Sequence, residues 1–207
     1  MKKAFIWDLD GTLLDSYDII VSSLQETYKE FGIDTNKDDI LEHSIKYSVS
    51  SYIQSMEQKT GIPFEKAKER YSEISGKKKL NIQLIPHAEE ILECLSQQGS
   101  QNFVFTNRGK TTEDVLKNLG IFEFFAEIIT SQDGFPRKPA PDAINYLMDK
   151  YHLDPSFTYY VGDRTLDMEC AKNAGIKGIL FLSKTSVGER SGLEDFVVED
   201  LYEIKEI

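Results

Sequence analysis

The stretch AFIWDLDGTLLDS, residues 4–16, joins a short apolar run to two aspartates and a Gly-Thr turn. Ala4–Trp7 predicts a buried β-strand, and Asp8 and Asp10 follow at its carboxyl end, where open α/β sheets bind ligands. Side chains two residues apart in a strand point to the same side, so both carboxylates reach one region of space. Two adjacent carboxylates repel each other unless a cation or a proton lies between them. The stretch therefore predicts a divalent metal ion, a shared proton, or both.

Further apolar runs alternate with helical patterns along the rest of the chain. The predicted strands are Asn102–Phe105, Glu127–Ile129, Thr158–Val161, Gly178–Leu182 and Phe196–Val198. The predicted helices are Pro86–Gln98, Thr111–Leu119, Pro141–Tyr151 and Leu166–Ala174, with Gly99, Gly120 and Gly175 where helices end. Such alternation indicates parallel strands joined by right-handed crossovers. We therefore predict an α/β fold with a doubly wound parallel sheet and a Rossmann-like core.

Residues 16–80 interrupt this alternation because they show helical patterns and no strand pattern. The predicted helices are Tyr17–Phe31, Asp38–Ile45, Val49–Lys59 and Phe64–Ser75, punctuated by Gly32, Gly61 and Gly76. The run Lys77-Lys78-Lys79 predicts a solvated return linker. We expect residues 1–15 and 81–207 to form an α/β catalytic core domain, and residues 16–80 to form an inserted all-helical cap domain.

The composition limits the partners of the protein. The 207 residues carry a formal net charge of -11, with 40% hydrophobic and 29% charged residues, which is typical of a globular protein. The negative charge argues against nucleic acid and anionic membranes. It allows a small phosphorylated metabolite, because a metal ion and a few basic side chains reverse the local sign. We expect a monomer or a weak homo-oligomer.

The expected location is cytoplasmic. The chain has two cysteines, Cys94 and Cys170, which are far apart in the sequence and fit a reducing compartment. No apolar run approaches the roughly 20 residues that a membrane span needs. We therefore expect no membrane partner.

The two aspartates of the first stretch have the chemistry of phosphoryl transfer. Asp8 can attack phosphorus as a nucleophile and form an aspartyl-phosphate, which divides hydrolysis into two easier steps. Asp10 is placed to protonate the leaving oxygen and then to deprotonate the attacking water, as a general acid/base. The alternative is structural, because Asp-Gly is a common turn pair and either carboxylate can begin a turn.

A second acidic pair, Asp163 and Asp167, follows the fourth predicted strand of the alternating region. The two lie four residues apart at the start of a helix, so they face the same side. Mg²⁺ prefers oxygen ligands and takes only one or two carboxylates directly. We predict Mg²⁺ bound by Asp8, by Asp163 and by the backbone carbonyl of Asp10. Asp167 is expected to contact a metal-bound water or to steady Lys138. The alternative is that Asp167 has only a structural role, as a carboxylate in the first turn of a helix, where the helix dipole favours it.

Basic and hydroxyl side chains complete the predicted site. Pro139 favours an extended backbone at Lys138, which would balance the charge of the nucleophile and of the phosphoryl group. Thr106 and Asn107 end another strand, where a hydroxyl and backbone amides can bind phosphate oxygens. Arg108 can reach a second anionic group on the substrate. The alternative for Lys138 is an exposed loop lysine without a role in the site. The alternative for Arg108 is a solvent-exposed arginine in a turn.

These four segments, in this order, resemble the haloacid-dehalogenase-like hydrolase superfamily over the whole chain. The insertion resembles the branch with a helical cap after the first motif, to which phosphoglycolate-phosphatase-like enzymes and β-phosphoglucomutase belong. The resemblance implies these roles: nucleophile Asp8, acid/base Asp10, phosphate-binding hydroxyl Thr106, charge balancer Lys138, and metal ligand Asp163 supported by Asp167. One departure lies outside these motifs: His87 stands where the family's Pro-Gly-Val pattern has glycine.

Within the expected cap, Lys46, Tyr47 and Ser48 are candidate specificity residues. They lie in a hydroxyl-rich stretch with one cation, which suits a small polar or sugar-like leaving group. The alternative is an ordinary connection between helices, with serine as an N-cap.

The leading interpretation is a magnesium-dependent phosphatase that hydrolyses small phosphate monoesters. The first alternative is a phosphomutase of the β-phosphoglucomutase type, which the same core would support. The second is a receiver-like phospho-acceptor module, which also combines aspartates, a hydroxyl and a lysine but needs neither Asp10 nor the helical insertion. Dehalogenation is not expected, because that branch lacks a second carboxylate at the position of Asp10. The phosphonate-cleaving branch needs a cap lysine, for which Lys46 and Lys59 are candidates by location only.

Overall fold

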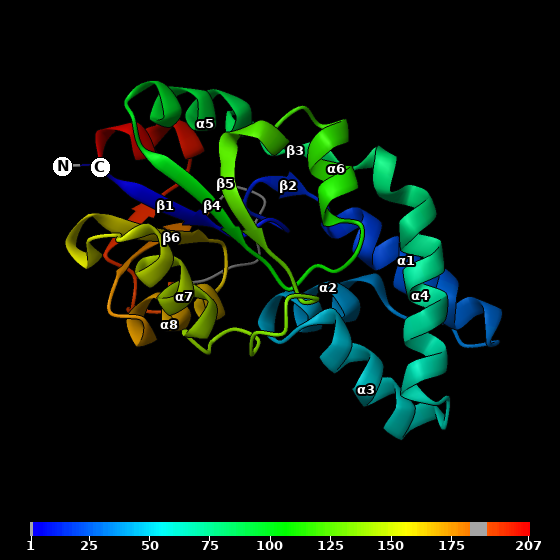
Figure 1. The fold of residues 1–207 in the computed structure, drawn as a ribbon. Helices are drawn as coiled ribbons and strands as arrows, with labels where there is room; N and C mark the ends of the chain where they lie inside the picture. Colours follow the sequence, from blue (N-terminus) through cyan, green and yellow to red (C-terminus); the bar gives the residue numbers. More distant parts are fainter. Residues whose placement is uncertain (1, 183–189) are drawn as a thin grey trace. The chain divides into compact units, whose positions relative to one another are not determined.

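A computed structural model describes residues 2–182 and 190–207 (Figure 1). Its internal contacts divide the chain into two compact units. We call Met1–Asp15 with Gln83–Ile207 the α/β unit, and Ser16–Ile82 the helical unit. The chain thus leaves the α/β unit after residue 15 and returns after residue 82, whereas the sequence-based boundary for the return is residue 80.

Six parallel strands form the sheet of the α/β unit, in the order β5-β4-β1-β6-β7-β8. They are β1 Ala4–Trp7, β4 Gln101–Phe105, β5 Phe125–Ile129, β6 Thr158–Gly162, β7 Lys177–Phe181 and β8 Phe196–Val198. The chain adds β4 and β5 on one side of β1, and then β6, β7 and β8 on the other. The strand order therefore reverses beside β1, and the predicted doubly wound fold class is confirmed. At such a reversal the loops on either side diverge and leave room for a ligand.

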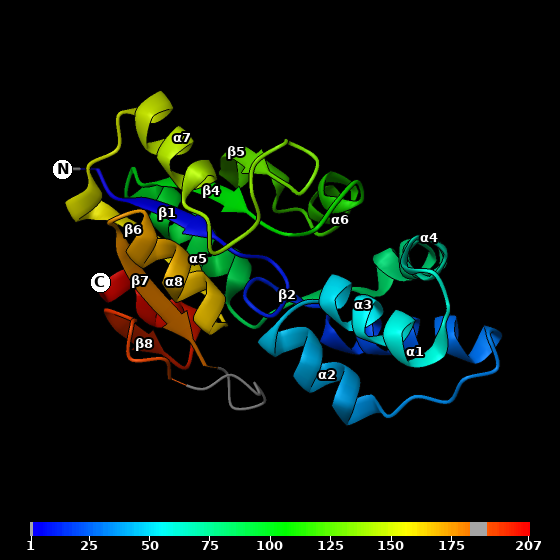
Figure 2. The same cartoon turned by 90° about the horizontal axis from the view of Figure 1, so that it is seen from below.

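Helices cover both faces of this sheet (Figures 1 and 2). They are α5 Ala88–Gln97, α6 Thr112–Asn118, α7 Asp142–Tyr151 and α8 Thr165–Asn173, with 3₁₀ segments η2 Phe122–Phe124, η3 Pro155–Phe157 and η4 Leu201–Glu206. One face lies under α7 and α8, and the opposite face under α5 and η4. Between the sheet and α7, the side chains of Ile6, Phe103, Phe105 and Leu147 form part of a buried apolar core. Alternate residues of β1 thus anchor the strand that carries Asp8.

The start of α5 accounts for the departure at His87. This residue has φ 65°, in the left-handed region that favours glycine. Its Nδ1 lies 2.8 Å from both carboxylate oxygens of Asp200. This contact holds the imidazole at the surface of the α/β unit, so a side chain is accommodated at a position that usually requires glycine.

The helical unit contains α1 Tyr17–Glu30, α2 Lys37–Lys46, α3 Val49–Thr60 and α4 Phe64–Lys78, followed by the 3₁₀ segment η1 Lys79–Asn81. It has a core of its own, made of Ile20, Val21, Leu24, Tyr28, Ile40, Tyr52, Ile53, Met56 and Ala67. Within the described ranges, no helix combines the length and apolar character required to cross a bilayer.

The end of α4 corrects one sequence-based prediction. Gly76 does not end the helix and the three lysines are not a linker, because α4 continues to Lys78 and Lys79 begins η1. Lys78 Nζ lies 2.8 Å from Glu26 Oε2 on α1. Basic side chains are also favourable near a helix C-terminus, whereas one internal glycine costs only about 1 kcal/mol. The ion pair and the helix dipole therefore favour helix over linker.

A second feature was not predicted at all. β2 Leu14–Asp15 and β3 Gln83–Leu84 form a two-stranded antiparallel pair in the α/β unit. They directly precede and follow the helical unit in the sequence. Two residues are too few to show a period-two pattern, so only their pairing reveals them as strands.

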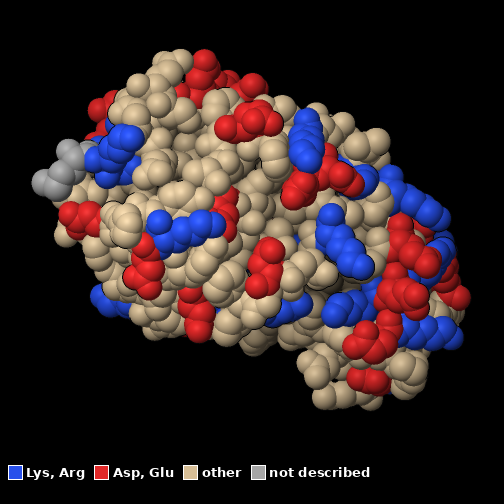
Figure 3. Space-filling model, in the orientation of Figure 1, with Lys and Arg blue, Asp and Glu red and all other residues tan. Residues whose placement is uncertain are grey.

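Charges of both signs are interspersed over the face shown in Figure 3. In the helical unit, the guanidinium of Arg70 pairs with Glu30 and Glu73, each at 2.5 Å. Lys37 pairs with Asp18 at 3.1 Å. Basic side chains of this unit thus lie beside acidic ones.

Candidate active site

The predicted site residues follow strands that are in register. Trp7 on β1 pairs with Val104 on β4 and with Val161 on β6. The backbone N–H of Asp8 donates to the Val161 carbonyl at 2.9 Å, which continues the ladder by one residue. Parallel strands end on the same edge of a sheet. The residues that follow closely on these three positions therefore emerge together; they include Asp8, Thr106 and Asp163.

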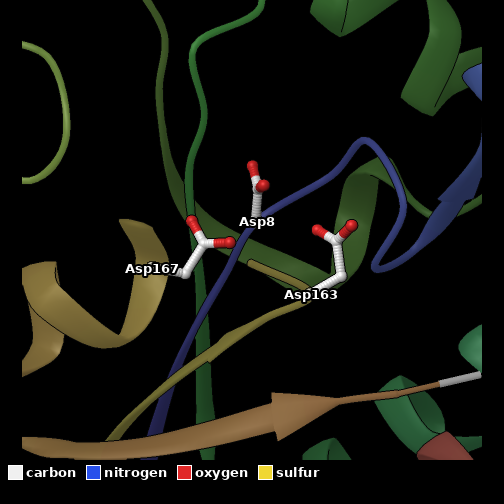
Figure 4. A group of neighbouring side chains, drawn as sticks. All are labelled: Asp8, Asp163 and Asp167. Carbon is white, nitrogen blue, oxygen red and sulfur yellow. The ribbon is translucent and has the colours of Figure 1, made fainter. Parts of the chain in front are cut away.

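Three carboxylates meet at this edge (Figure 4). One oxygen from each of Asp8, Asp163 and Asp167 lies within 4.8 Å of the other two, and all three residues are buried. We call them the acidic triad. Asp8 follows β1, Asp163 follows β6, and Asp167 lies in the first turn of α8. Carboxylate oxygens are the ligands that Mg²⁺ prefers, so the donor set of the triad fits a hard divalent cation.

A buried lysine connects two members of the acidic triad. Lys138 Nζ lies 2.9 Å from Asp8 Oδ1 and 2.7 Å from Asp167 Oδ1, and the lysine side chain is 0% exposed. The ammonium also lies over the rings of Tyr160 and Phe105, at 5.2 Å and 5.7 Å from their centroids. Burial alone lowers the pKa of Lys138, but the carboxylates of Asp167 and Asp8 raise it above its ordinary value. The lysine is therefore charged and fixed in place.

The two carboxylates that contact Lys138 differ in their pKa shifts. Burial acts to raise the pKa of Asp8, but the positive charges of Lys138 and Arg164 outweigh it and hold this pKa below the usual value. Burial and the negative charge of Asp8 together raise the pKa of Asp167, despite the opposing charge of Lys138. The cationic partners thus favour the ionised form of Asp8, which is the form that a nucleophile needs.

Asp167 also has a structural task. Its Oδ1 accepts from Lys138, and its Oδ2 accepts the backbone N–H of Arg164 at 3.1 Å, which caps the start of α8. Gly162 approaches it so closely that a Cβ at that position would lie 2.3 Å from the Asp167 Cβ. The carboxylate is therefore held by the lysine, the helix start and the end of β6. This geometry is what a role in steadying Lys138 requires.

Asp10 lies outside the acidic triad and has a different partner. The Arg108 guanidinium donates to Asp10 Oδ1. The Arg108 backbone N–H donates to the buried Thr106 hydroxyl at 3.2 Å, and the half-buried Asn107 lies between them in the loop after β4. Arg108 thus joins the loop after β4 to the loop after β1, which brings the predicted phosphate-binding residues to the same edge.

Two residues of the site were missed by sequence reasoning. The Arg164 guanidinium lies within reach of the whole acidic triad, with Nη2 3.2 Å from Asp8 Oδ2. Thr12 donates its hydroxyl to Asp163 Oδ1 at 3.2 Å. Both residues lie inside the acidic segments themselves, and that position is the only sequence feature that could have identified them.

The candidate specificity residues belong to the helical unit. Lys46 ends α2, and its Nζ lies 5.6 Å from the centroid of the Tyr47 ring, which is 54% exposed. Ser48 is the N-cap of α3 and accepts the Ser51 backbone N–H at 3.0 Å. The capping alternative therefore holds for Ser48, and the specificity role of the three residues stays a prediction.

Known proteins resemble this chain along most of its length. The model of a family described as haloacid dehalogenase-like hydrolase matches residues 5–181. The pyrophosphatase PpaX of Oceanobacillus iheyensis is 27% identical over 206 residues, covering 98% of this chain and 94% of the relative. A phosphoglycolate phosphatase of Vibrio vulnificus is 27% identical over 221 residues, covering 99% and 95%.

A solved structure supports the fold independently. The crystal structure of a predicted phosphoglycolate phosphatase from Haemophilus somnus superposes with a TM-score of 0.87 at 23% identity, covering 99% of this chain and 97% of that one. The superfamily resemblance, the α/β fold class and the predicted class of enzyme, a hydrolase of this superfamily, are confirmed. Since the family model matches far more than half of the sequence, the chain belongs to the haloacid dehalogenase-like hydrolase family.

Proposed function

We propose that the protein is a magnesium-dependent phosphatase that hydrolyses small phosphoric monoesters through an aspartyl-phosphate on Asp8. The observation that carries this proposal is the buried Asp8, fixed by Lys138 at 2.9 Å beside two further carboxylates. The relative named as a phosphoglycolate phosphatase supports hydrolysis of a monoester, and the one named as a pyrophosphatase supports hydrolysis at a phosphoryl group.

The proposed reaction has two steps. A carboxylate oxygen of Asp8 attacks phosphorus, the bond from phosphorus to the leaving oxygen breaks, and Asp10 gives its proton to that oxygen. Asp10 then takes a proton from water, which attacks the phosphorus of the aspartyl-phosphate. Inorganic phosphate leaves, and the Asp8 carboxylate is restored. Lys138 balances negative charge on Asp8 and the phosphoryl group, where fixed charges contribute most to rate.

The acidic triad would hold the magnesium ion through Asp8 and Asp163, with the Asp10 carbonyl as predicted. Asp167 is committed to Lys138 and to the start of α8, so we place it beside the ion rather than on it. When bound, Mg²⁺ would supply positive charge to the phosphoryl oxygens. Thr12 orients Asp163 through its hydroxyl.

The proposed substrates carry a second anionic group. Arg108 is 13% exposed, lies beside the acid/base Asp10, and can pair with a carboxylate or phosphate through its planar guanidinium. Phosphoglycolate and pyrophosphate, named for the two relatives, both carry such a group. Arg108→Gln should raise KM for phosphoglycolate more than for an aryl phosphate that lacks the second anion.

Phosphate release from a panel of esters tests the function. The panel contains sugar phosphates, nucleotides, phosphoglycolate, pyrophosphate and an aryl phosphate, each assayed with Mg²⁺ and with EDTA. We expect metal-dependent release that Asp8→Asn abolishes and that Asp10→Asn lowers about 10²–10⁴-fold. Asp149→Asn, which changes an exposed aspartate on α7, is the matched control and should leave release unchanged.

Other outcomes would redirect the proposal. Return of the phosphate to a sugar phosphate, without release, would favour the phosphomutase alternative. Release that persists in Asp8→Asn would exclude the aspartyl-phosphate. We also propose a cytosolic setting, supported by the free thiols Cys94 and Cys170.

A further inference from the structure

The side chain of Arg164 occupies the middle of the acidic triad. Its Nη2 lies 3.2 Å from Asp8 Oδ2, and its Nε lies 3.7 Å from Asp167 Oδ2 and 4.0 Å from Asp163 Oδ1. One guanidinium is thus within 4.0 Å of all three carboxylates that could hold a divalent cation. Two cations cannot share this position without strong repulsion.

The two oxygens of Asp8 have different cationic partners. Oδ1 contacts Lys138 and Oδ2 contacts Arg164. A divalent cation shared by Asp8 and Asp163 would bind an oxygen that already has a cationic partner, and repulsion between the two cations favours loss of one of these contacts. Lys138 is fully buried and contacts two carboxylates at 2.9 Å and 2.7 Å. If it left, both buried carboxylates would lose the positive charge that they share.

Arg164 can leave at much lower cost. Its side chain is 11% exposed, and its contact with Asp8 is longer than that of Lys138. The start of α8 is capped through the Arg164 backbone N–H, which donates to Asp167. The side chain can therefore turn outward while the cap of α8 stays intact.

We propose that Arg164 is the internal counter-ion of the acidic triad: its guanidinium holds Asp8 Oδ2 and gives this oxygen up when a divalent cation binds. The inference rests on the metal site of the proposed function. It makes Arg164 a positioning residue that sets the metal affinity. Until the exchange takes place, both oxygens of the nucleophile are engaged by cationic side chains.

Metal binding in the absence of substrate tests the exchange. The full chain is titrated with Mn²⁺, and the free ion is followed by electron paramagnetic resonance. Arg164→Met, which keeps an unbranched apolar side chain but removes the charged guanidinium, should bind Mn²⁺ at least about tenfold more tightly than wild type, because no competing cation has to leave. Arg164→Lys should stay closer to wild type. Unchanged or weaker binding by Arg164→Met would overturn the proposal.

Two controls distinguish a failure of the proposed Arg164 exchange from a failure of the metal site on which it rests. Arg70→Met makes the same change in net charge on the helical unit, and should leave Mn²⁺ affinity unchanged. Asp163→Asn should abolish tight binding in both the wild-type and the Arg164→Met background. Wild-type binding that requires Asp163, without a gain in Arg164→Met, would refute the exchange and leave the metal site standing. No Asp163-dependent binding in any variant would refute the metal site itself.

A direct readout follows the arginine. The Nε–H resonance of Arg164, assigned by its loss in Arg164→Lys, should shift on addition of Mg²⁺ to the wild type as the contact with Asp8 breaks. A resonance that stays in place at saturating Mg²⁺ would show that the guanidinium keeps its position. Circular dichroism of each variant verifies that it is folded.

Discussion

Some buried polar groups of the two units differ in how they are partnered. In the α/β unit, Asp8, Lys138 and Asp167 form a connected chain of ion pairs below 3 Å. In the helical unit, the buried hydroxyls of Tyr28 and Ser44 have no hydrogen-bond partner among the described residues. Removing one member of a buried ion pair leaves a charge uncompensated, whereas removing an unpartnered hydroxyl leaves nothing behind. The α/β unit should therefore be sensitive to small polar changes that the helical unit tolerates.

Two spectroscopic signals make this comparison measurable. Trp7 is the only tryptophan of the sequence and is buried in β1, so its fluorescence reports the α/β unit. Far-ultraviolet circular dichroism reports both units and detects loss of helix in the helical one. Urea unfolding in EDTA, followed by both signals, gives the free energy of unfolding without a contribution from metal.

The largest effect is expected at Lys138. Lys138→Met leaves Asp8 and Asp167 buried without their shared cation, and should lower the free energy of unfolding of the α/β unit by about 3–5 kcal/mol. The matched change is Lys150→Met, whose ion pair with Glu127 is exposed to solvent on the lysine side and should matter little. Equal stability of Lys138→Met and wild type would contradict the expectation that the α/β unit is sensitive to changes in its buried polar groups.

The next effect is expected where β6 approaches α8. A Cβ on Gly162 would lie 2.3 Å from the Asp167 Cβ, so Gly162→Ala must displace the carboxylate that steadies Lys138. We expect a loss of about 3 kcal/mol, as for an overpacked core, together with a fall in phosphate release. A stable Gly162→Ala protein with full activity would show that Asp167 can move without consequence.

A pair of tyrosines tests hydrogen bonding directly. Burial raises the pKa of Tyr160 well above its ordinary value, so its hydroxyl remains a donor, and it donates to the Phe105 carbonyl at 2.8 Å. Tyr160→Phe should lower the free energy of unfolding by about 1–2 kcal/mol, because a buried carbonyl loses its partner. Tyr28→Phe removes an unpartnered hydroxyl and should be neutral or slightly stabilising. The opposite ranking of these two variants would contradict the distinction between the units.

The smallest effect is expected in α4, where the substitution should raise the free energy of unfolding instead of lowering it. A Cβ added at Gly76 would meet no atom within 4 Å, and the residue lies inside a helix. Gly76→Ala should stabilise the helical unit by about 0.5–1 kcal/mol, because alanine loses less backbone entropy than glycine. The circular dichroism transition should shift to higher urea. A destabilised Gly76→Ala protein would indicate that α4 ends near residue 76 in solution, as the sequence pattern suggested.

The amino-acid sequence determined the alternation of strands and helices, the helical insertion, and the strand ends that carry Asp8, Thr106 and Asp163. These features depend on local periodicity and on the rule that parallel strands end on one edge of a sheet. The sequence left two roles open for Asp167, and only the tertiary structure showed its contact with Lys138. Only the tertiary structure, too, showed that the Arg164 side chain points toward the acidic triad. Long flexible side chains reach many positions from one backbone, and their direction is decided by charges brought close through folding, which no local pattern contains.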